Sequence, residues 1–219
     1  TKNMAKEPAM TREEAEKAME VGIEKVRELS GQGYKIIATG EMGIGNTTTS
    51  SALASYFLQE DVEKMTGRGA GLTSKALEKK IAVVRKAIAD YSPAFTDAID
   101  ALAALGGFDI AGMAGVFLGG AIYRVPIVMD GFISSTAALT ATRICPACKD
   151  FIMASHVSKE PAAEKILAAM DKEAALHCDM CLGEGTGAVT LFPILDLATQ
   201  FYEQMSTFED IEIDAYVEL

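Results

Sequence analysis

Residues 35–49 read KIIATGEMGIGNTTT, and this stretch decides the fold class. The apolar run over 35–39 is typical of a short buried strand, and the glycines and threonines after it are typical of a loop. Before it, residues 11–30 place apolar side chains at helical spacing behind a Thr11–Glu14 capping box. After it, residues 50–58 have the pattern of an apolar helix. Helix, strand, glycine loop and helix together indicate an α/β unit.

The same order of elements recurs along the rest of the chain. Strand patterns cover 125–129 and 151–154, helix patterns cover 73–90, 160–169 and 190–201, and residues 110–122 form a buried segment of small residues. Parallel strands need crossover connections, which these helices supply. We therefore predict an α/β fold with a mostly parallel sheet flanked by helices, in a Rossmann-like three-layer arrangement. No linker is visible, so residues 1–219 are expected to form a single domain.

Composition and charge exclude several classes of protein. The 219 residues carry 20 Lys and Arg against 31 Asp and Glu, a formal net charge of −11, which argues against nucleic-acid partners. The longest uncharged apolar stretch, 110–123, is too short to cross a bilayer, so we expect no membrane partner. The four cysteines without a secretory signal favour a reducing compartment, and we expect the protein to be cytoplasmic.

Two glycine loops are candidate phosphate-binding sites. The first holds Gly43, Gly45, Asn46 and Thr47 between a strand end and a helix start. Backbone N–H groups at such a helix start attract phosphate, and glycine lets the ligand approach closely. The alternative is a tight turn that needs glycine for its backbone conformation. Neither a Walker motif nor a complete dinucleotide fingerprint is present, which disfavours a dehydrogenase.

The second glycine loop has Gly67 and Gly69, with Lys80 on the helix that follows. Two such loops in one sheet are stronger evidence for a phosphorylated ligand than either loop would be alone. Lys80 is a candidate cation for that ligand. The alternative is a lysine in solvent, since it ends the charged run 78–80.

Three carboxylates stand beside glycines. Glu184, within GEGTG at 183–187, is a candidate general base, or else a carboxylate that stabilises the N-terminus of the last helix. Asp109 and Asp130 are candidates for binding sugar hydroxyls, or else helix caps. Spacing alone does not choose between these roles.

The cysteines form two Cys-x-x-Cys pairs, Cys145 with Cys148 and Cys178 with Cys181. Such pairs are typical of zinc sites, so a structural zinc is one candidate, with His156 and His177 as further ligands. A redox disulfide and four unreactive thiols are the alternatives.

An ordered set of segments gives the chain a family resemblance that spans nearly its whole length. The segments are EPAMT (7–11), GEMGIGNTT (40–48), TGRG (66–69), GGFDIAGM (106–113), PIVMDGFI (126–133), SH (155–156) and LGEGTGA (182–188). In content and order they resemble the nicotinate-nucleotide–dimethylbenzimidazole phosphoribosyltransferase family. The family transfers the phosphoribosyl group of nicotinate mononucleotide to 5,6-dimethylbenzimidazole or a similar base. The transfer inverts C1′ and gives α-ribazole 5′-phosphate in cobalamin biosynthesis.

The resemblance also implies roles for individual residues. Glu184 would be the general base and Glu41 a second carboxylate in the base pocket. The glycine loops would hold the 5′-phosphate with Lys80 and Ser158, and Asp109 and Asp130 would meet the ribose. No cofactor is required, and the family forms homodimers.

Two departures from the family keep other functions open. The chain is about a third shorter than the family pattern, with the N-terminal part absent, and the cysteines are not part of that pattern. The alternatives are a truncated, non-catalytic mononucleotide-binding protein and a zinc-stabilised α/β module.

Overall fold

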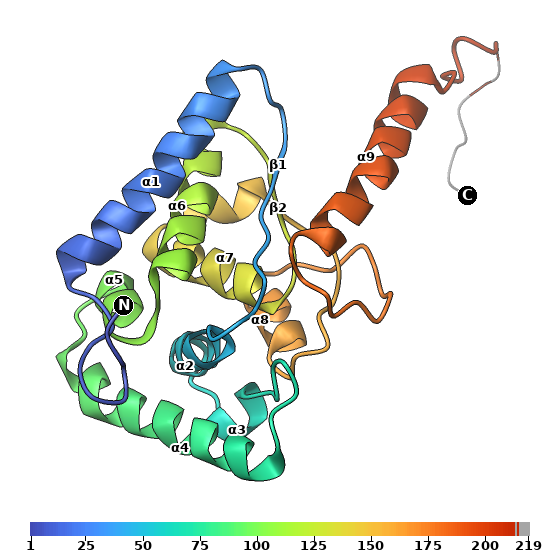
Figure 1. Ribbon diagram of the computed structural model, residues 1–219. Coiled ribbons are helices and arrows are strands. Elements are labelled where there is room, and N and C mark those ends of the chain that lie inside the picture. The colour runs from blue at the N-terminus through green and yellow to red at the C-terminus, as the bar shows by residue number, and fades with distance from the viewer. Residues whose placement is uncertain (213, 215–219) are drawn as a thin grey trace.

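Three short parallel strands form the sheet expected from the sequence. The computed structural model describes residues 1–212 and 214 (Figure 1). Strands β1 (Ile37–Ala38), β2 (Ile127–Met129) and β3 (Ile152–Ala154) lie in the order β1-β2-β3, with β2 parallel to both neighbours. All three predicted strands are present. Each is shorter than its predicted run, because only two or three residues of the run pair with a neighbouring strand.

Helices surround this sheet. They are α1 (Arg12–Gly31), α2 (Thr47–Leu58), α3 (Val62–Met65), α4 (Ser74–Tyr91), α5 (Ala98–Leu105), α6 (Phe108–Tyr123), α7 (Phe132–Ile144), α8 (Ala163–Ala169) and α9 (Thr186–Gln204), with short 3₁₀ turns at Ser92–Ala94 and Pro146–Phe151. The expected parallel sheet flanked by helices is therefore confirmed. The segment 110–122 is most of helix α6, whereas α3 and α5 were not predicted.

The two faces of the sheet are covered very differently. Along β2, Ile127 and Met129 belong to the main hydrophobic core with the helices on one face. Val128 points to the other face and packs with Ala188 and Leu191 of α9. This alternation follows from the two-residue period of a strand. Figure 1 shows α9 on the side of the sheet away from α6, extending well beyond it.

Helices α1 and α6 pack with their backbones almost in contact. A Cβ atom on Gly22 of α1 would lie 2.0 Å from the Gly112 carbonyl oxygen of α6. Likewise, a Cβ atom on Gly115 would lie 2.0 Å from the Met19 carbonyl oxygen. Only glycine fits such a close approach, so these positions fix how deeply the two helices interlock.

The starts of two helices follow the sequence closely. The predicted capping box of α1 is present: Thr11 Oγ1 accepts from the Glu14 N–H at 3.2 Å, and the Glu14 carboxylate accepts from the Thr11 N–H at 2.8 Å. Helix α4 likewise begins after Thr73, whose hydroxyl accepts from the Ala76 N–H. Such caps satisfy N–H groups that lack a partner in the first turn.

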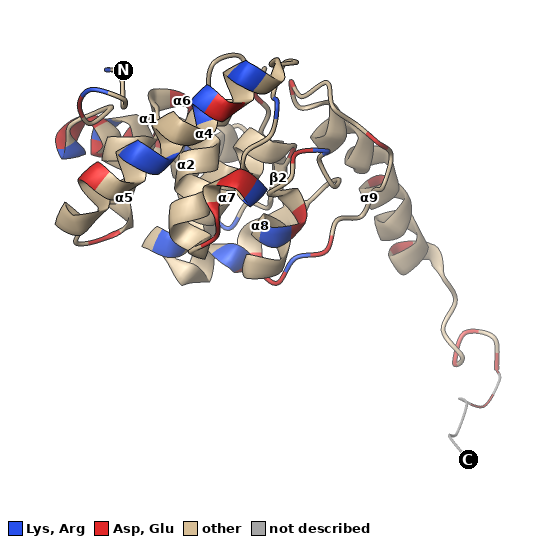
Figure 2. Cartoon of the chain, turned by 90° about the horizontal axis from the view of Figure 1, so that it is seen from below, with Lys and Arg blue, Asp and Glu red and all other residues tan. Residues whose placement is uncertain are grey.

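Helix α9 begins four residues before the predicted start at Thr190, because the glycine loop itself forms its N-cap at Gly185. Its first turns pack on the sheet, and the rest is exposed. Figure 2 shows no Lys or Arg on α9. In the described part of the chain, no helix combines the length and the hydropathy needed to span a bilayer.

Candidate active site

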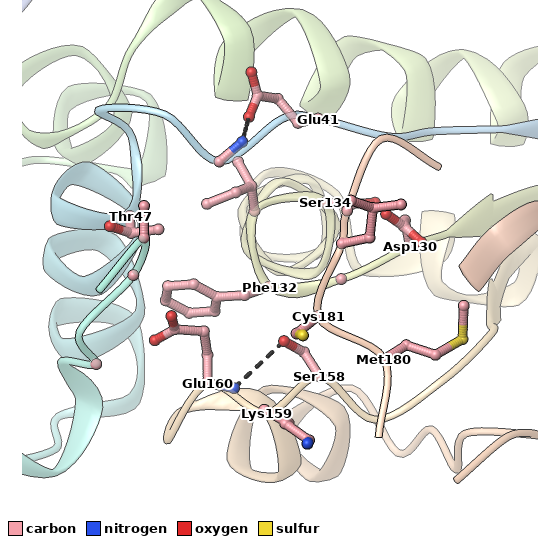
Figure 3. A pocket seen from close by; sticks show the side chains of 18 of the residues that line it. Glu41, Thr47, Asp130, Phe132, Ser134, Ser158, Lys159, Glu160, Met180 and Cys181 are labelled. Carbon is pink, nitrogen blue, oxygen red and sulfur yellow. Dashed lines mark hydrogen bonds between the residues drawn. The ribbon is translucent and has the colours of Figure 1, made fainter. Parts of the chain in front are cut away.

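A pocket of about 700 Å³ opens at the carboxyl ends of the strands (Figure 3). This is where ligands bind in open parallel sheets. Leu77 of α4 and five segments line it: 41–47 after β1, 66–70 before α4, 130–134 after β2, 156–161 after β3, and 180–183 before α9. The pocket therefore collects the glycine loops that the sequence analysis singled out.

Lys80 joins the two glycine loops behind the wall of this pocket: its contacts Thr47 and Gly67 line the pocket, whereas Lys80 itself does not. Its Nζ donates to Thr47 Oγ1 at 2.9 Å and to the Gly67 carbonyl at 2.9 Å. The side chain is only 6% exposed, so the interpretation as a solvent lysine is wrong. Burial lowers the pKa of Lys80, and the nearby Glu160 carboxylate opposes that shift. A buried ammonium without an ion-pair partner within 4 Å in the described chain is poised to receive an anion.

The loops are shaped by glycines in the left-handed region. Gly43 and Gly45 both have a φ of +83°, and Gly69 has a φ of +53°. Gly69 also packs against Thr47, whose Oγ1 would lie 2.8 Å from an added Cβ. Both loops therefore need glycine for conformation, and their contact brings their backbones to the same end of the pocket. The turn and phosphate-binding interpretations of Gly43 and Gly45 are compatible.

Glu41 lines the pocket and folds over its own loop. Its carboxylate accepts a short hydrogen bond from the Gly43 N–H, drawn as a dashed line in Figure 3. The half-buried side chain stands at the opposite side of the pocket from Ser158 and Glu160. Glu41 therefore places a carboxylate at the wall of this pocket.

Asn46 and Asp109, two predicted binding residues, bond to each other outside the pocket wall. Asn46 Nδ2 donates to Asp109 Oδ2 at 2.6 Å, and neither residue lines the pocket, nor does Gly45. Asp109 lies in the first turn of α6, so this bond ties the loop to the core helix. The structure places Asp109 as a support for Asn46 rather than at the pocket wall.

Asp130 is buried beneath the start of α9. Its Oδ1 accepts from the N–H groups of Gly187 at 2.8 Å and Ala188 at 3.1 Å, and its Oδ2 accepts from the Gly185 N–H at 3.1 Å. These contacts are those of a helix cap, which was the alternative to a role in sugar binding.

Glu184 is exposed beside the pocket, and its neighbour Gly183 is the residue that lines it. Its backbone has a φ of +59°, which is rare for a residue with a side chain. The Glu184 N–H donates to the Glu41 carbonyl at 2.9 Å. The structure thus joins the backbones of the two candidate acids, while the Glu184 side chain faces solvent.

Ser158 lines the pocket as predicted and accepts from the Glu160 N–H at 3.4 Å (Figure 3). Sequence reasoning missed two neighbours: Glu160 Oε2 and Thr66 Oγ1 are buried without a hydrogen-bond partner at the pocket wall. Thr66 directly precedes the second glycine loop, and this position in the sequence could have identified it as a pocket residue. Nothing in the sequence around Glu160 indicates its position.

His156 is buried between Asp130 and the start of α9. Its Nδ1 lies 3.1 Å from Ser155 Oγ and 3.8 Å from Asp130 Oδ1. Burial lowers the pKa of His156, and Asp130 opposes the shift. The ring fills the space that Gly187 leaves, since an added Cβ there would lie 1.9 Å from Nδ1.

The cysteines do not form the cluster that a structural zinc requires. Cys148 is buried, which raises its pKa to about 12, whereas Cys145, Cys178 and Cys181 are exposed. Cys181 lines the pocket. All four are free thiols, and no group of three or more His, Cys, Asp or Glu within 1–212 and 214 is arranged to hold a metal. The zinc prediction, including His156 and His177, gains no support from this arrangement.

Comparison with known proteins finds relatives over nearly the whole chain. Residues 1–213 match a family described as phosphoribosyltransferase. The nicotinate-nucleotide–dimethylbenzimidazole phosphoribosyltransferase of Clostridium acetobutylicum is 54% identical over 99% of this chain and 61% of its own length. The protein of that name from Acetivibrio thermocellus is 52% identical over 99% and 62%.

A solved structure shares the fold. The crystal structure of CobT from Thermus thermophilus superposes with a TM-score of 0.92 at 36% identity, covering 99% of this chain and 64% of that one. The chain therefore spans about three fifths of the length of the relatives it matches. It belongs to the nicotinate-nucleotide–dimethylbenzimidazole phosphoribosyltransferase family.

Proposed function

We propose that this chain transfers the phosphoribosyl group of nicotinate mononucleotide to 5,6-dimethylbenzimidazole or a similar base. The observation that carries the proposal is the buried Lys80, which bridges the two glycine loops behind the wall of a pocket that Glu41 also lines. Its products would be nicotinate and α-ribazole 5′-phosphate, an intermediate of cobalamin biosynthesis. The names of the 54% and 52% identical relatives support the same reaction.

The phosphate is assigned to the loop end of the pocket. Lys80 supplies a positive charge, and the loop around Gly67 is proposed to supply backbone N–H groups, since the Gly43 N–H already donates to the Glu41 carboxylate. Thr47 supplies a hydroxyl that already contacts the ammonium at 2.9 Å. Because the Lys80 Nζ now meets only neutral oxygens, a bound phosphate would give this buried charge its missing partner.

The chemistry needs one base. A ring nitrogen of the benzimidazole attacks C1′ as the bond from C1′ to nicotinate breaks, so the configuration at C1′ inverts. The leaving nicotinate is a pyridinium that takes up the bonding electrons and departs without a proton. The incoming ring must lose the proton on its other nitrogen, and Glu184 is the residue proposed to take it.

Glu41 is proposed to hold that ring in line for the attack. Its carboxylate lines the pocket, and its carbonyl oxygen accepts the hydrogen bond from the Glu184 N–H. Positioning of this kind supplies much of the rate in a displacement between two bound reactants. The exposed Glu184 side chain would have to turn toward the pocket when the base binds.

The remaining expectations are part of the same proposal. The scheme consumes no redox equivalent and needs no cofactor, since a carboxylate accepts the one proton released. We propose that the chain forms a homodimer, which the exposed apolar side chains of α9 support. We also propose that it is located in the cytoplasm. The net charge of −11 disfavours nucleic-acid partners.

The test is release of nicotinate from nicotinate mononucleotide, followed by chromatography with and without dimethylbenzimidazole. We expect release that depends on the added base and is lost in Glu184→Gln. Glu20→Gln is the matched control, because Glu20 is an exposed carboxylate on α1. Saturable binding of the mononucleotide in calorimetry without release would overturn transfer and favour the non-catalytic binding protein. Absence of saturable binding would overturn the phosphate site itself.

A further inference from the structure

The loop before α9 has an unusual backbone that needs support. Three successive residues, Gly183, Glu184 and Gly185, have φ values of +78°, +59° and +82°. Glycine adopts this region freely, but Glu184 does not, so its conformation persists only where neighbouring contacts impose it. A strained backbone at a candidate general base raises the question of what holds it.

Part of the support is local. The Thr186 N–H and hydroxyl both donate to the Gly183 carbonyl, at 3.0 Å and 2.7 Å. On the other side, Gly40 lets the end of β1 touch the loop, since an added Cβ there would lie 2.2 Å from the Gly185 nitrogen. Together with the Glu184 N–H, which donates to the Glu41 carbonyl at 2.9 Å, these contacts hold the loop to the segment after β1, but none of them reaches the central strand β2.

The contact between this loop and the segment after β2 is made by the Asp130 carboxylate. It accepts from the Gly185 N–H at 3.1 Å, next to Glu184, and from the first N–H groups of α9 at Gly187 and Ala188. Residue 130 follows β2, the central strand of the sheet. One side chain therefore links the most constrained strand of the fold to the residue after the candidate base.

Asp130 is itself fixed in place. Its own N–H donates to Ser134 Oγ at 3.0 Å, and that hydroxyl lies 2.5 Å from Thr39 Oγ1 at the end of β1. The residue is only 2% exposed, and its oxygens already accept three N–H groups. Asp130 lines the pocket, but three of the roughly four acceptor positions of its carboxylate are taken by N–H groups, which leaves little capacity for a ribose hydroxyl.

We propose that Asp130 is a positioning residue for Glu184, and that it acts by fixing the loop 183–188 rather than by touching the substrate. This inference rests on the proposed function, in which Glu184 takes the proton from the incoming ring. A positioning residue of this kind affects the chemical step, because a displacement of the base by about 1 Å can cost about 100-fold in rate.

Asp130→Asn is the informative variant. Its amide oxygen can still accept from Gly187 and Ala188, so the cap of α9 is kept in part, but its Nδ2 brings a donor against the Gly185 N–H. We expect kcat to fall about 100-fold, while the KM for nicotinate mononucleotide changes less than about twofold. Ser134→Ala, which loosens Asp130 without changing charge, should lower kcat by a smaller factor.

The matched control is Asp97→Asn. Asp97 caps α5 by accepting from the Ile99 and Asp100 N–H groups at 2.9 Å and 3.1 Å, and it also pairs with Arg12, away from the pocket. Its substitution removes the ion pair with Arg12 and should lower thermal stability, yet leave kcat unchanged. A role for Asp130 in stability alone predicts that the two variants behave alike.

Two outcomes would overturn the proposal. A rise in KM with kcat intact in Asp130→Asn would make Asp130 a substrate contact. Unchanged amide hydrogen exchange over 183–188 in Asp130→Asn would show that it does not fix the loop, whether or not the chain is active. If the wild-type chain releases no nicotinate, the proposed function fails, and faster exchange over 183–188 in Asp130→Asn alone would still support the role of Asp130 in holding the loop.

Discussion

Helices α6 and α9 are both rich in apolar residues, but α6 packs against α1 and α7, whereas most of α9 is exposed. Helix α6 meets α1 through glycines, with backbone atoms in contact at Gly112 and Gly115. Helix α9 buries only Gly187, Ala188 and Leu191. From residue 196 onward every residue of α9 is exposed, and Tyr202 reaches 88%.

The difference teaches that the size of the side chains, more than apolar content, decides how a helix is held. Small residues let a second backbone approach closely, so α6 and α1 pack tightly against each other. Helix α9 carries large side chains and is held only at its first turns. Those turns adjoin Asp130 and the loop of Glu184, so the proposed site depends on the weakly anchored helix.

The strongest way to break the α1–α6 contact is Gly115→Ala. The new Cβ would lie 2.0 Å from the Met19 carbonyl oxygen, so the helices must separate, and we expect a loss of about 2–3 kcal/mol in the free energy of unfolding. Gly112→Ala is the control in the same helix, where the nearest atom to a new Cβ is 3.8 Å away. It should gain up to about 1 kcal/mol from helix propensity.

Urea denaturation of the two variants and the wild type measures the difference. Equal effects of the same substitution at positions 112 and 115 would mean that the α1–α6 contact is not limited by backbone approach.

At α9 the corresponding test is Gly187→Ala. The added Cβ would lie 1.9 Å from His156 Nδ1 and 2.8 Å from Asp130 Oδ1, so the first turn of α9 must shift. We expect a loss of about 1–2 kcal/mol together with faster amide exchange over 183–188. The double variant Gly187→Ala with His156→Ala should recover part of the stability, which a double-mutant cycle measures. Simple additivity would contradict the steric account.

The anchorage of α9 should also depend on pH. Burial lowers the pKa of His156 below its ordinary value of 6.5, so the unfolded chain takes up a proton before the folded chain does. Stability is therefore complete above 6.5 and declines as the pH falls through the lowered pKa. Urea midpoints at about pH 7 and about pH 5 should differ less in His156→Gln than in the wild type.

His177→Gln is the matched control for this pH effect, because His177 is the other histidine of the chain and is exposed. It should follow the wild type. A decline that is the same in all three proteins would mean that burial of His156 is not linked to stability.

The smallest effect on stability is expected at the bare end of α9. Phe201→Ala should change the free energy of unfolding by less than about 0.5 kcal/mol, because the side chain is exposed. It should, however, weaken self-association in sedimentation velocity, since exposed apolar patches drive contacts between chains. Leu191→Ala, on the buried side of the same helix, should cost about 2–3 kcal/mol. Comparable losses at both positions would show that the end of α9 is packed in solution.

Much of the fold follows from local signals in the sequence. A parallel sheet with helices can be predicted from three features of the sequence: the capping box of α1, the glycines after β1 and the apolar runs of the three strands. Helix α5 was missed although Asp97 before an apolar run is a cap signal. The exposure of most of α9 could not be predicted. An apolar pattern indicates that a helix face can be buried, but it does not indicate which element covers that face.

The site was predictable in its loops but not in its side-chain partners. Glycine at 43, 67 and 69 indicated where the chain must turn or approach a ligand. That Lys80 is buried between those loops, and that Asp130 caps α9, depends on the packing of helices distant in sequence. A charged run and an isolated aspartate look the same in sequence whether they face solvent or the interior.

The hydrogen bond between the Glu184 N–H and the Glu41 carbonyl joins segments that are far apart along the chain. Contacts of such long sequence separation carry a large loop-closure entropy. During synthesis on a ribosome, the strand and loop that carry Glu41 emerge on the order of ten seconds before Glu184. A growing chain can therefore form its helices early, but it cannot bring its two proposed catalytic carboxylates together until most of it has been translated.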